Sequence, residues 1–344
     1  MVCSSSFRPR ATTPRSKLRI TLACWGYDRV APLVSGAVRP DGIDLVFLDQ
    51  PVEETFFRMA RHREFDASEM SLSSYTVTLA RDDPPFIAIP VFPSRMFRHG
   101  SIFVSAKSGI REPRELAGKR VGVPEYQMTA PVWIRGILSD DYGVKAESAE
   151  HLTGGEEQPG REEKLKLNLP AQFQVRPLGP AQTLSRLIAE GEIDALYTAR
   201  PPSTFASRPK DVRRLFENYV EAEREYYRRT RVFPIMHTVV IRRDVYRANP
   251  WVAQSLFKAF VESQRRTYHD LLEAHALKAM LPWLPAHVEE ARRELGDDWW
   301  PYGFAANRHV LDTFLRYHHE QGLSPRRLAP EALFAPETLE SFVI

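Results

Sequence analysis

Three arginines and two histidines stand where a protein could act on an acidic ligand. Arg95 and Arg98 lie in a stretch that crosses from one part of the chain to another, and Arg200 ends a predicted strand. A guanidinium offers a planar fork of N–H donors that matches a carboxylate. His99 and His237, one in each crossing stretch, can exchange a proton near neutral pH. We therefore predict a site that binds carboxylates and transfers a proton, with His99 as the first candidate donor and His237 as the second.

Polar and aromatic side chains that follow predicted strands are further candidates. Glu69 could orient a histidine or accept a proton, or it could satisfy backbone donors at the start of a helix. Ser71 either contacts the ligand or caps that helix. Trp25 and Tyr27 follow the first strand, and Trp25 either stacks on an aromatic ring or packs in the core. We expect Glu69 at the catalytic centre and the other three residues against the ligand.

The middle of the chain offers an anion site at a helix start. Tyr126, Gln127 and Thr129 open a helix predicted at 128–138, where backbone amides that lack a partner in the helix suit an anion. We expect all three residues to contact the substrate.

Recognised metal and nucleotide motifs are absent from the sequence. It contains no His-Glu-x-x-His, no Cys-x-x-Cys, no calcium-type acidic loop and no Gly-x-Gly-x-x-Gly. We expect neither a metal nor another cofactor. The alternative left open is a three-ligand metal site, which His99, His237 and Glu69 could form if the fold brings them together.

Alternating strands and helices must position these residues. Hydrophobic periodicity and turn signals predict strands at 18–24, 43–48, 65–68, 87–92, 120–123, 173–176 and 193–197, with helices at 27–35, 51–63, 71–81, 128–138 and 180–190. This alternation predicts an α/β protein whose sheets are mostly parallel, followed by a helical C-terminal third. The stretches 95–105 and 233–241 would cross between two lobes, so we predict a cleft with a hinge.

The predicted limits are a disordered tail at 1–16, one lobe formed by 17–98 plus 238–344, and a second lobe at 99–237. Residues 146–170 are predicted as a long loop, which in a compact domain is usually functional or mobile. The two lobes also contain a weak internal sequence repeat, because the segments 58–67 and 186–195 are similar and both end in Asp-Ala at the start of a predicted strand.

Composition excludes several classes of function. The 344 residues carry 47 Lys and Arg against 44 Asp and Glu, a net charge of +3, so we expect no nucleic-acid partner. No run of about 18 apolar residues could span a membrane. Residues 1–17 lack the apolar segment of a secretory signal, and only Cys3 and Cys24 are cysteines. We expect a cytoplasmic protein, and the sequence leaves a homo-oligomer open.

Six stretches, in order along residues 18–275, resemble the 4,5-dihydroxyphthalate decarboxylase family. They are Trp25-Gly26-Tyr27-Asp28-Arg29, the segment 65–71, the segment 92–99, the segment 121–129, Gly154-Gly155 through Gly160-Arg161-Glu162-Glu163-Lys164, and the segment 233–238. The resemblance implies a type II periplasmic-binding-protein-like fold, with two mixed sheets and hinge crossovers. It also implies a cytoplasmic carboxy-lyase that converts an aromatic dicarboxylate, 4,5-dihydroxyphthalate, to protocatechuate and CO2 in phthalate degradation. The alternative is a non-catalytic binding protein for a small anionic solute.

Overall fold

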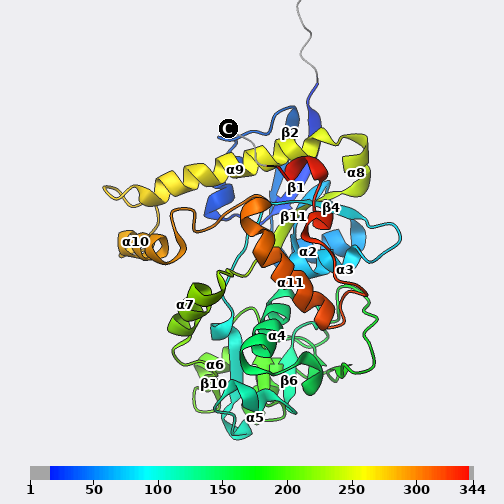
Figure 1. Cartoon of the computed structure of the whole chain (residues 1–344), viewed down its shortest axis with the longest axis vertical. Coiled ribbons are helices and arrows are strands. Elements are labelled where there is room, and N and C mark those ends of the chain that lie inside the picture. Colours follow the sequence, from blue (N-terminus) through cyan, green and yellow to red (C-terminus); the bar gives the residue numbers. More distant parts are fainter. Residues whose placement is uncertain (1–15, 341–344) are drawn as a thin grey trace, which may run out of the picture.

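The computed structural model describes residues 16–340, so the tail predicted at 1–16 lies outside the described residues except for Ser16. Two separate sheets form the centres of two lobes (Figure 1). The first sheet has the order β2-β1-β3-β11-β4. Its strands are β1 (Leu18–Cys24), β2 (Ile43–Asp49), β3 (Ala67–Ser71), β4 (Phe86–Ile89) and β11 (His237–Arg242). Strands β1, β2 and β3 run parallel, whereas β11 is antiparallel to both of its neighbours.

The second sheet has the order β10-β5-β9-β6-β7-β8. Its strands are β5 (Ile102–Ser105), β6 (Arg120–Val123), β7 (Glu150–Thr153), β8 (Val175–Pro177), β9 (Ala195–Tyr197) and β10 (Val212–Arg214). Strands β6 to β9 are parallel, and β5 is antiparallel to β9 and β10. Both sheets are therefore mixed, as predicted.

Helices surround both sheets and connect the lobes. Those before β11 are α1 (Ala31–Val34), α2 (Val52–His62), α3 (Leu72–Thr78), α4 (Thr129–Tyr142), α5 (Leu184–Glu190), α6 (Ser203–Ser207) and α7 (Tyr219–Thr230). The C-terminal third contains α8 (Arg243–Ala248), α9 (Trp251–Leu272), α10 (Leu284–Leu295) and α11 (Arg308–Glu320). Helix α9 packs on the first lobe, whereas α11 runs from that lobe down to α4 in the second (Figure 1).

The strands form where the sequence supplies alternating or continuous apolar residues. In β1, Ile20 and Leu22 face a core shared with α9, and Ala23 contributes to the core cluster on the other face. In the second lobe, Val121 and Val123 of β6 pack with Ile134 of α4. The apolar faces of the helices therefore cover both sheets, and the polar ends of the strands are left at the junction between the lobes.

The weak internal sequence repeat corresponds to a repeated local structure. Asp66, before β3, accepts a hydrogen bond from the backbone N–H of Thr21 at 2.9 Å. Asp194, before β9, accepts one from the backbone N–H of Arg120, also at 2.9 Å. In both lobes an aspartate thus joins a helix–strand turn to the neighbouring parallel strand.

One sequence prediction of structure is corrected. Residues 146–170 are not one loop, because β7 lies within them as an inner strand between β6 and β8. Its residues His151 and Leu152 are almost fully buried, a placement that the flanking glycines and charges conceal in the sequence. The helix α10 lies in the C-terminal third, which was predicted to be helical. The strands of the two sheets fall within the lobe limits proposed from the sequence, except that β11 of the first sheet begins one residue before the limit, at His237, and the limits themselves stay a prediction.

Candidate active site

Glu69 and His237 form a hydrogen-bonded pair at the edge of the first sheet that faces the second lobe. Glu69 lies in β3, and His237 is the first residue of the antiparallel neighbour β11. The His237 Nδ1 is 2.6 Å from the Glu69 Oε1. Glu69 is fully buried, whereas the His237 side chain is 16% exposed. Since Nδ1 faces the carboxylate, Nε2 points the opposite way, and within residues 16–340 no hydrogen bond to Nε2 is found.

Three more donors from the end of β1 converge on Glu69. The Tyr27 hydroxyl donates to Oε1 at 2.8 Å, the Trp25 backbone N–H donates to Oε2 at 3.2 Å, and the Cys24 thiol lies 3.4 Å from Oε2. Burial alone would raise the pKa of Glu69, but the charge and hydrogen bond of His237, together with these donors, hold it below its usual value. Burial and the Glu69 charge raise the pKa of both Tyr27 and Cys24. Glu69 is therefore a fixed anion that can orient the His237 ring.

Helix α2 connects this pair to a pocket between the lobes. The ring of Phe56 meets His237 edge-on, with 4.7 Å between ring centroids. One turn earlier, Glu53 pairs with Arg200 at 2.5 Å and with Arg161 at 3.3 Å, and both arginines belong to the second lobe. The pocket has a volume of about 630 Å³, and its walls include Glu53, Phe57, Arg61, Glu156, Arg161 and Arg200. Its size suits a small ligand. Its lining carries both signs of charge, with three arginines and Lys164 beside five glutamates, and the arginines are the groups that could bind a carboxylate.

Arg98 is a buried cation at the crossing between the lobes. It is 5% exposed, its Nε donates to the Met236 sulfur at 3.2 Å, and its Nη1 donates to the Ala199 carbonyl at 3.2 Å. Burial lowers the pKa of Arg98 to about 10, so it remains charged at neutral pH. A third, longer bond runs from Nη1 to the Ser101 hydroxyl at 3.5 Å, so its hydrogen bonds within the described residues go to uncharged groups, although Glu223 is near enough to favour the charge. Because Met236 precedes His237 in the chain, Arg98 is an anion-binding candidate beside the pair.

The fork of Arg95 is occupied by acceptors of the protein itself. Its Nη1 donates to the Phe233 carbonyl at 3.0 Å, and its Nη2 donates to the Pro301 carbonyl at 2.8 Å and to the Asn307 side chain. These bonds connect the crossing segment to the C-terminal third, and contact of Arg95 with substrate stays a prediction. Arg200 differs, because its side chain is 61% exposed and its one ion pair is with Glu53.

His99 lies among aromatic residues of the second lobe, away from the contacts of His237. Its ring centroid is 5.2 Å from that of Phe216 and 5.3 Å from that of Tyr226. It is 2% exposed, and its Nδ1 is buried without a hydrogen-bond partner. Burial, helped by the charge of Arg229, lowers the pKa of His99 to about 4. A ring that stays neutral and enclosed at pH 7 suits packing, and a catalytic role for His99 stays a prediction.

This burial predicts how stability depends on pH. An unfolded His99 takes up a proton near pH 6.5, whereas the folded one does so only near pH 4. Stability should therefore fall as the pH falls from about 6.5 to 4, by about 3 kcal/mol from this residue. In His99→Gln, the melting temperature measured over this range should decline less steeply than in the parent. The exposed His309 supplies the control, and His309→Gln should keep the parent slope. Equal slopes in all three proteins would refute the assignment.

Ser71 and Thr129 join the two lobes directly. Their hydroxyl oxygens are 2.8 Å apart, and the Ser73 backbone N–H donates to Thr129 at 3.0 Å. Ser71 also accepts from the Ser74 backbone N–H, so it caps α3, which was one of the two roles considered for it. The two side chains are thus brought together at the lobe junction.

The other predicted contacts are divided between the junction and the core. Gln127 is fully buried, and its amide makes no well-formed hydrogen bond, although it lies close enough to Glu163 to lower the pKa of that carboxyl. The Tyr126 hydroxyl instead donates to the Gln321 carbonyl at 3.2 Å, which directs its ring into the core around α11. Trp25 is 43% exposed and is free to contact a ligand. Contact of these residues with substrate stays a prediction.

Two residues of the interlobe pocket were missed by the sequence analysis. Glu156 and Arg161 lie in the segment that was treated as a loop, next to Gly154-Gly155 and Gly160. Arg161 bonds the almost fully buried Glu125 at 2.7 Å, which fixes the segment to the second lobe. The sequence signal that could have indicated these two residues is the cluster of charged residues between glycines in this segment.

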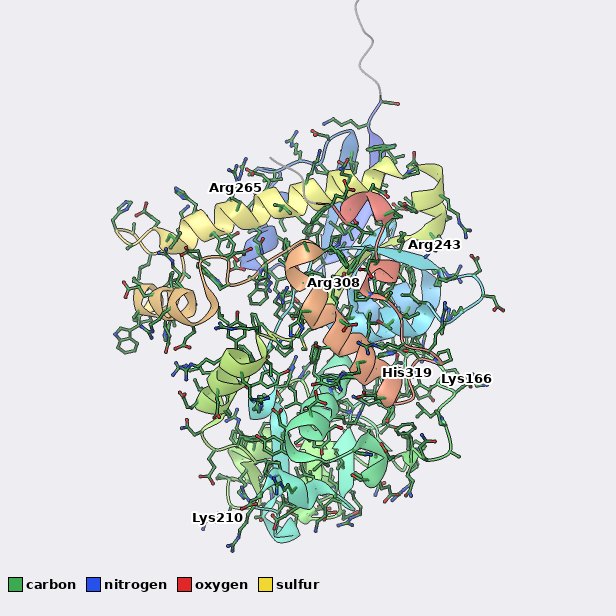
Figure 2. All side chains as sticks on the ribbon, in the orientation of Figure 1. Lys166, Lys210, Arg243, Arg265, Arg308 and His319 are labelled. Atoms are coloured by element: carbon green, nitrogen blue, oxygen red, sulfur yellow. The ribbon has the colours of Figure 1, made fainter. Side chains whose placement is uncertain are left out.

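The remaining surface offers no rival metal centre in residues 16–340, where no three His, Cys, Asp or Glu side chains are placed to hold an ion. The expectation that no metal is needed stays a prediction. His319 and Lys166 line a different cavity of about 870 Å³ beside the end of α11 (Figure 2). None of the described helices has the length and apolar character needed to cross a membrane.

Known structures define the class of fold. A putative periplasmic sulfonate-binding protein from Methylobacillus flagellatus matches with a TM-score of 0.54 and 13% identity, over 94% of this chain and 92% of that one. The periplasmic aliphatic sulphonate binding protein from Escherichia coli matches with a TM-score of 0.51 and 13% identity, over 94% of this chain and 99% of that one. The protein thus has the two-lobed, periplasmic-binding-protein-like fold that was predicted.

Curated sequences define the family. The chain is 46% identical over 329 residues to a 4,5-dihydroxyphthalate decarboxylase of Comamonas testosteroni, which covers 96% of this chain and 100% of that protein. It is 45% identical over 213 residues to the same-named protein of Pseudomonas putida, covering 62% of this chain and 83% of that one. A scan of protein-family models finds no match. The chain belongs to the 4,5-dihydroxyphthalate decarboxylase family, as its six matching stretches predicted.

Proposed function

We propose that this protein decarboxylates an aromatic dicarboxylic acid, 4,5-dihydroxyphthalate, to protocatechuate and CO2. The reaction needs donors for two adjacent carboxylates, a base for the hydroxyl para to the departing carboxylate, and an acid that protonates the ring carbon. The observation that carries the proposal is the Glu69–His237 pair, in a chain that is 46% identical to a named decarboxylase. The pair can move a proton. Arg98, whose hydrogen bonds go to uncharged groups, is the proposed cation for a carboxylate.

The side chains divide these tasks. His237, held through Nδ1 by Glu69, presents Nε2 to take the hydroxyl proton and to return it after CO2 leaves. The resulting electron density flows into the ring and favours protonation at the carbon that carries the carboxylate. Arg98 and Arg200 bind the carboxylates, and Arg200 exchanges its bond with Glu53 for one with substrate. Trp25 packs against the ring.

A non-catalytic binder of a small anionic solute is the alternative that the fold permits. The distinction is experimental. Purified protein incubated with 4,5-dihydroxyphthalate should release stoichiometric CO2 and form protocatechuate, followed by chromatography. Phthalate, which lacks the hydroxyls, should bind without reacting. Saturable binding of 4,5-dihydroxyphthalate with no turnover would refute the enzyme and support the binder.

We further propose that the protein works in the cytoplasm and assembles as a homo-oligomer, without nucleic acid. Support for the compartment comes from Cys24, whose buried thiol is free and bonded to Glu69. Support for self-association comes from the projecting segment between α9 and α10, where Leu277, Met280, Leu281 and Trp283 are exposed. The modest net charge of +3 argues against nucleic-acid binding.

A further inference from the structure

We infer that Glu156 is a second catalytic residue, which delivers the proton to the ring carbon that loses CO2. The inference rests on the proposed function and adds the acid that His237 does not supply. A single group that takes the hydroxyl proton cannot at the same time protonate a carbon on the opposite side of the ring. Two titratable groups on different sides of the substrate are needed, one basic and one acidic.

Glu156 lies where such an acid must lie. It follows β7, and Thr198, which follows β9, donates to its Oε2 at 2.5 Å. Both strands end at the side of the second sheet that faces the first lobe, which is where ligands of open α/β folds bind. Glu156 also lines the interlobe pocket with Arg200 and Glu53. A ligand held by Arg200 therefore lies next to Glu156.

One carboxyl oxygen of Glu156 has no hydrogen-bond partner. Thr198 occupies Oε2, while Oε1 is buried without a hydrogen-bond partner. The backbone carbonyl of Glu156 accepts from the Ser185 N–H at 2.9 Å, which fixes the residue against the start of α5. A buried carboxyl oxygen with no donor is poorly suited to a charge and well suited to a proton.

Burial is the main cause that keeps part of Glu156 in the acid form near neutral pH. Burial raises the pKa of Glu156 to about 7, the Thr198 hydrogen bond and the Arg200 charge lower it, and the Glu157 and Glu53 charges raise it. A bound dianion adds negative charge beside Glu156 and therefore raises its pKa further. Binding of substrate would thus protonate Glu156, and this proton is the one that the reaction consumes.

The proposed step balances. His237 Nε2 removes the hydroxyl proton, and the phenolate electrons flow into the ring, so that the carbon bearing the carboxylate forms a C–H bond with the proton of Glu156 Oε1. The carbon–carboxyl bond then breaks, CO2 leaves, and the bonding pair restores the aromatic ring as a phenolate. His237 returns its proton to that oxygen, and solvent protonates Glu156. One proton is consumed for each CO2 released.

The test compares Glu156→Gln with the parent in two measurements. Turnover of 4,5-dihydroxyphthalate should fall about 10²–10⁴-fold with little change in phthalate affinity. The parent rate should decline as the pH rises through about 7, and the variant should lack this limb. Independently of turnover, calorimetry of phthalate binding in buffers of different ionisation enthalpy should show proton uptake near pH 7 in the parent, and less uptake in Glu156→Gln.

Glu192→Gln is the matched control, because Glu192 is an exposed glutamate of the same lobe outside the pocket, and this variant should behave as the parent does. An active parent with parental kcat in Glu156→Gln would overturn the role of Glu156. A parent that does not decarboxylate the diacid would refute the proposed function instead. In that case the calorimetry still decides on Glu156, since unchanged proton uptake in the variant overturns its assignment as the proton carrier.

Discussion

Replacing His237 by glutamine should lower kcat for 4,5-dihydroxyphthalate by about 10²–10⁴-fold, the usual contribution of a general acid–base residue. The Nδ1 side of the ring is held by Glu69 at 2.6 Å, and a glutamine amide can still donate there, so the fold should survive. What the variant loses is the second ring nitrogen, which takes the hydroxyl proton. Steady-state kinetics, with the melting temperature measured on the same preparation, would show a large loss of kcat in a folded protein.

Two other histidines make this result specific. His309→Gln should retain parental kcat, because its exposed ring bonds the Thr230 carbonyl on the surface of α11. His99→Gln should lower stability more than turnover, since His99 is enclosed by Phe216 and Tyr226. A folded His237→Gln protein with parental kcat, or a His99→Gln protein that is stable but inactive, would return the catalytic role to His99.

The order of elements could be predicted from the sequence because each local signal agreed with the tertiary structure. The alternation in 18–24 is a local signal, and the Asp-Ala turns before β3 and β9 follow helix ends that are also local, although each aspartate bonds a distant strand. A contact between Glu69 and a histidine could also be predicted from the sequence. Both stand at the end of a strand or crossing segment, and β3 and β11 are neighbours in the sheet.

The environments of the two histidines could not be read from the sequence. His99 and His237 occupy comparable places in the two crossings, yet α7 covers His99 with Tyr226, whereas His237 faces the junction. That difference depends on the packing of a helix more than a hundred residues away. Likewise, β7 was missed because its burial comes from β6 and β8 on either side and not from its own periodicity.

Replacing Arg98 by methionine should weaken binding of 4,5-dihydroxyphthalate and of phthalate about 10- to 150-fold. A charge-assisted hydrogen bond contributes about 1.5–3 kcal/mol, and each 1.4 kcal/mol is tenfold in affinity. The unliganded protein should lose less stability than Arg95→Met does. The variant frees one carbonyl, that of Ala199, but it also removes a buried guanidinium that pairs with no carboxylate among the described residues, and the second effect offsets the first. Calorimetric titration with phthalate and thermal unfolding without ligand measure the two effects separately.

Arg95 gives the contrasting variant at the same crossing. Like Arg98, it is only 5% exposed, but its N–H groups already donate to the Phe233 and Pro301 carbonyls and to the Asn307 side chain. Arg95→Met should leave those acceptors without partners, so its melting temperature should fall while phthalate affinity changes little. We expect Arg98→Met to lose mainly phthalate affinity and Arg95→Met to lose mainly thermal stability. This pair of results would identify Arg98 as the residue whose charge pairs with the ligand. Parental phthalate affinity in Arg98→Met would place the carboxylates elsewhere, with Arg61, Arg161, Lys164 and Arg200 of the interlobe pocket as the remaining cations.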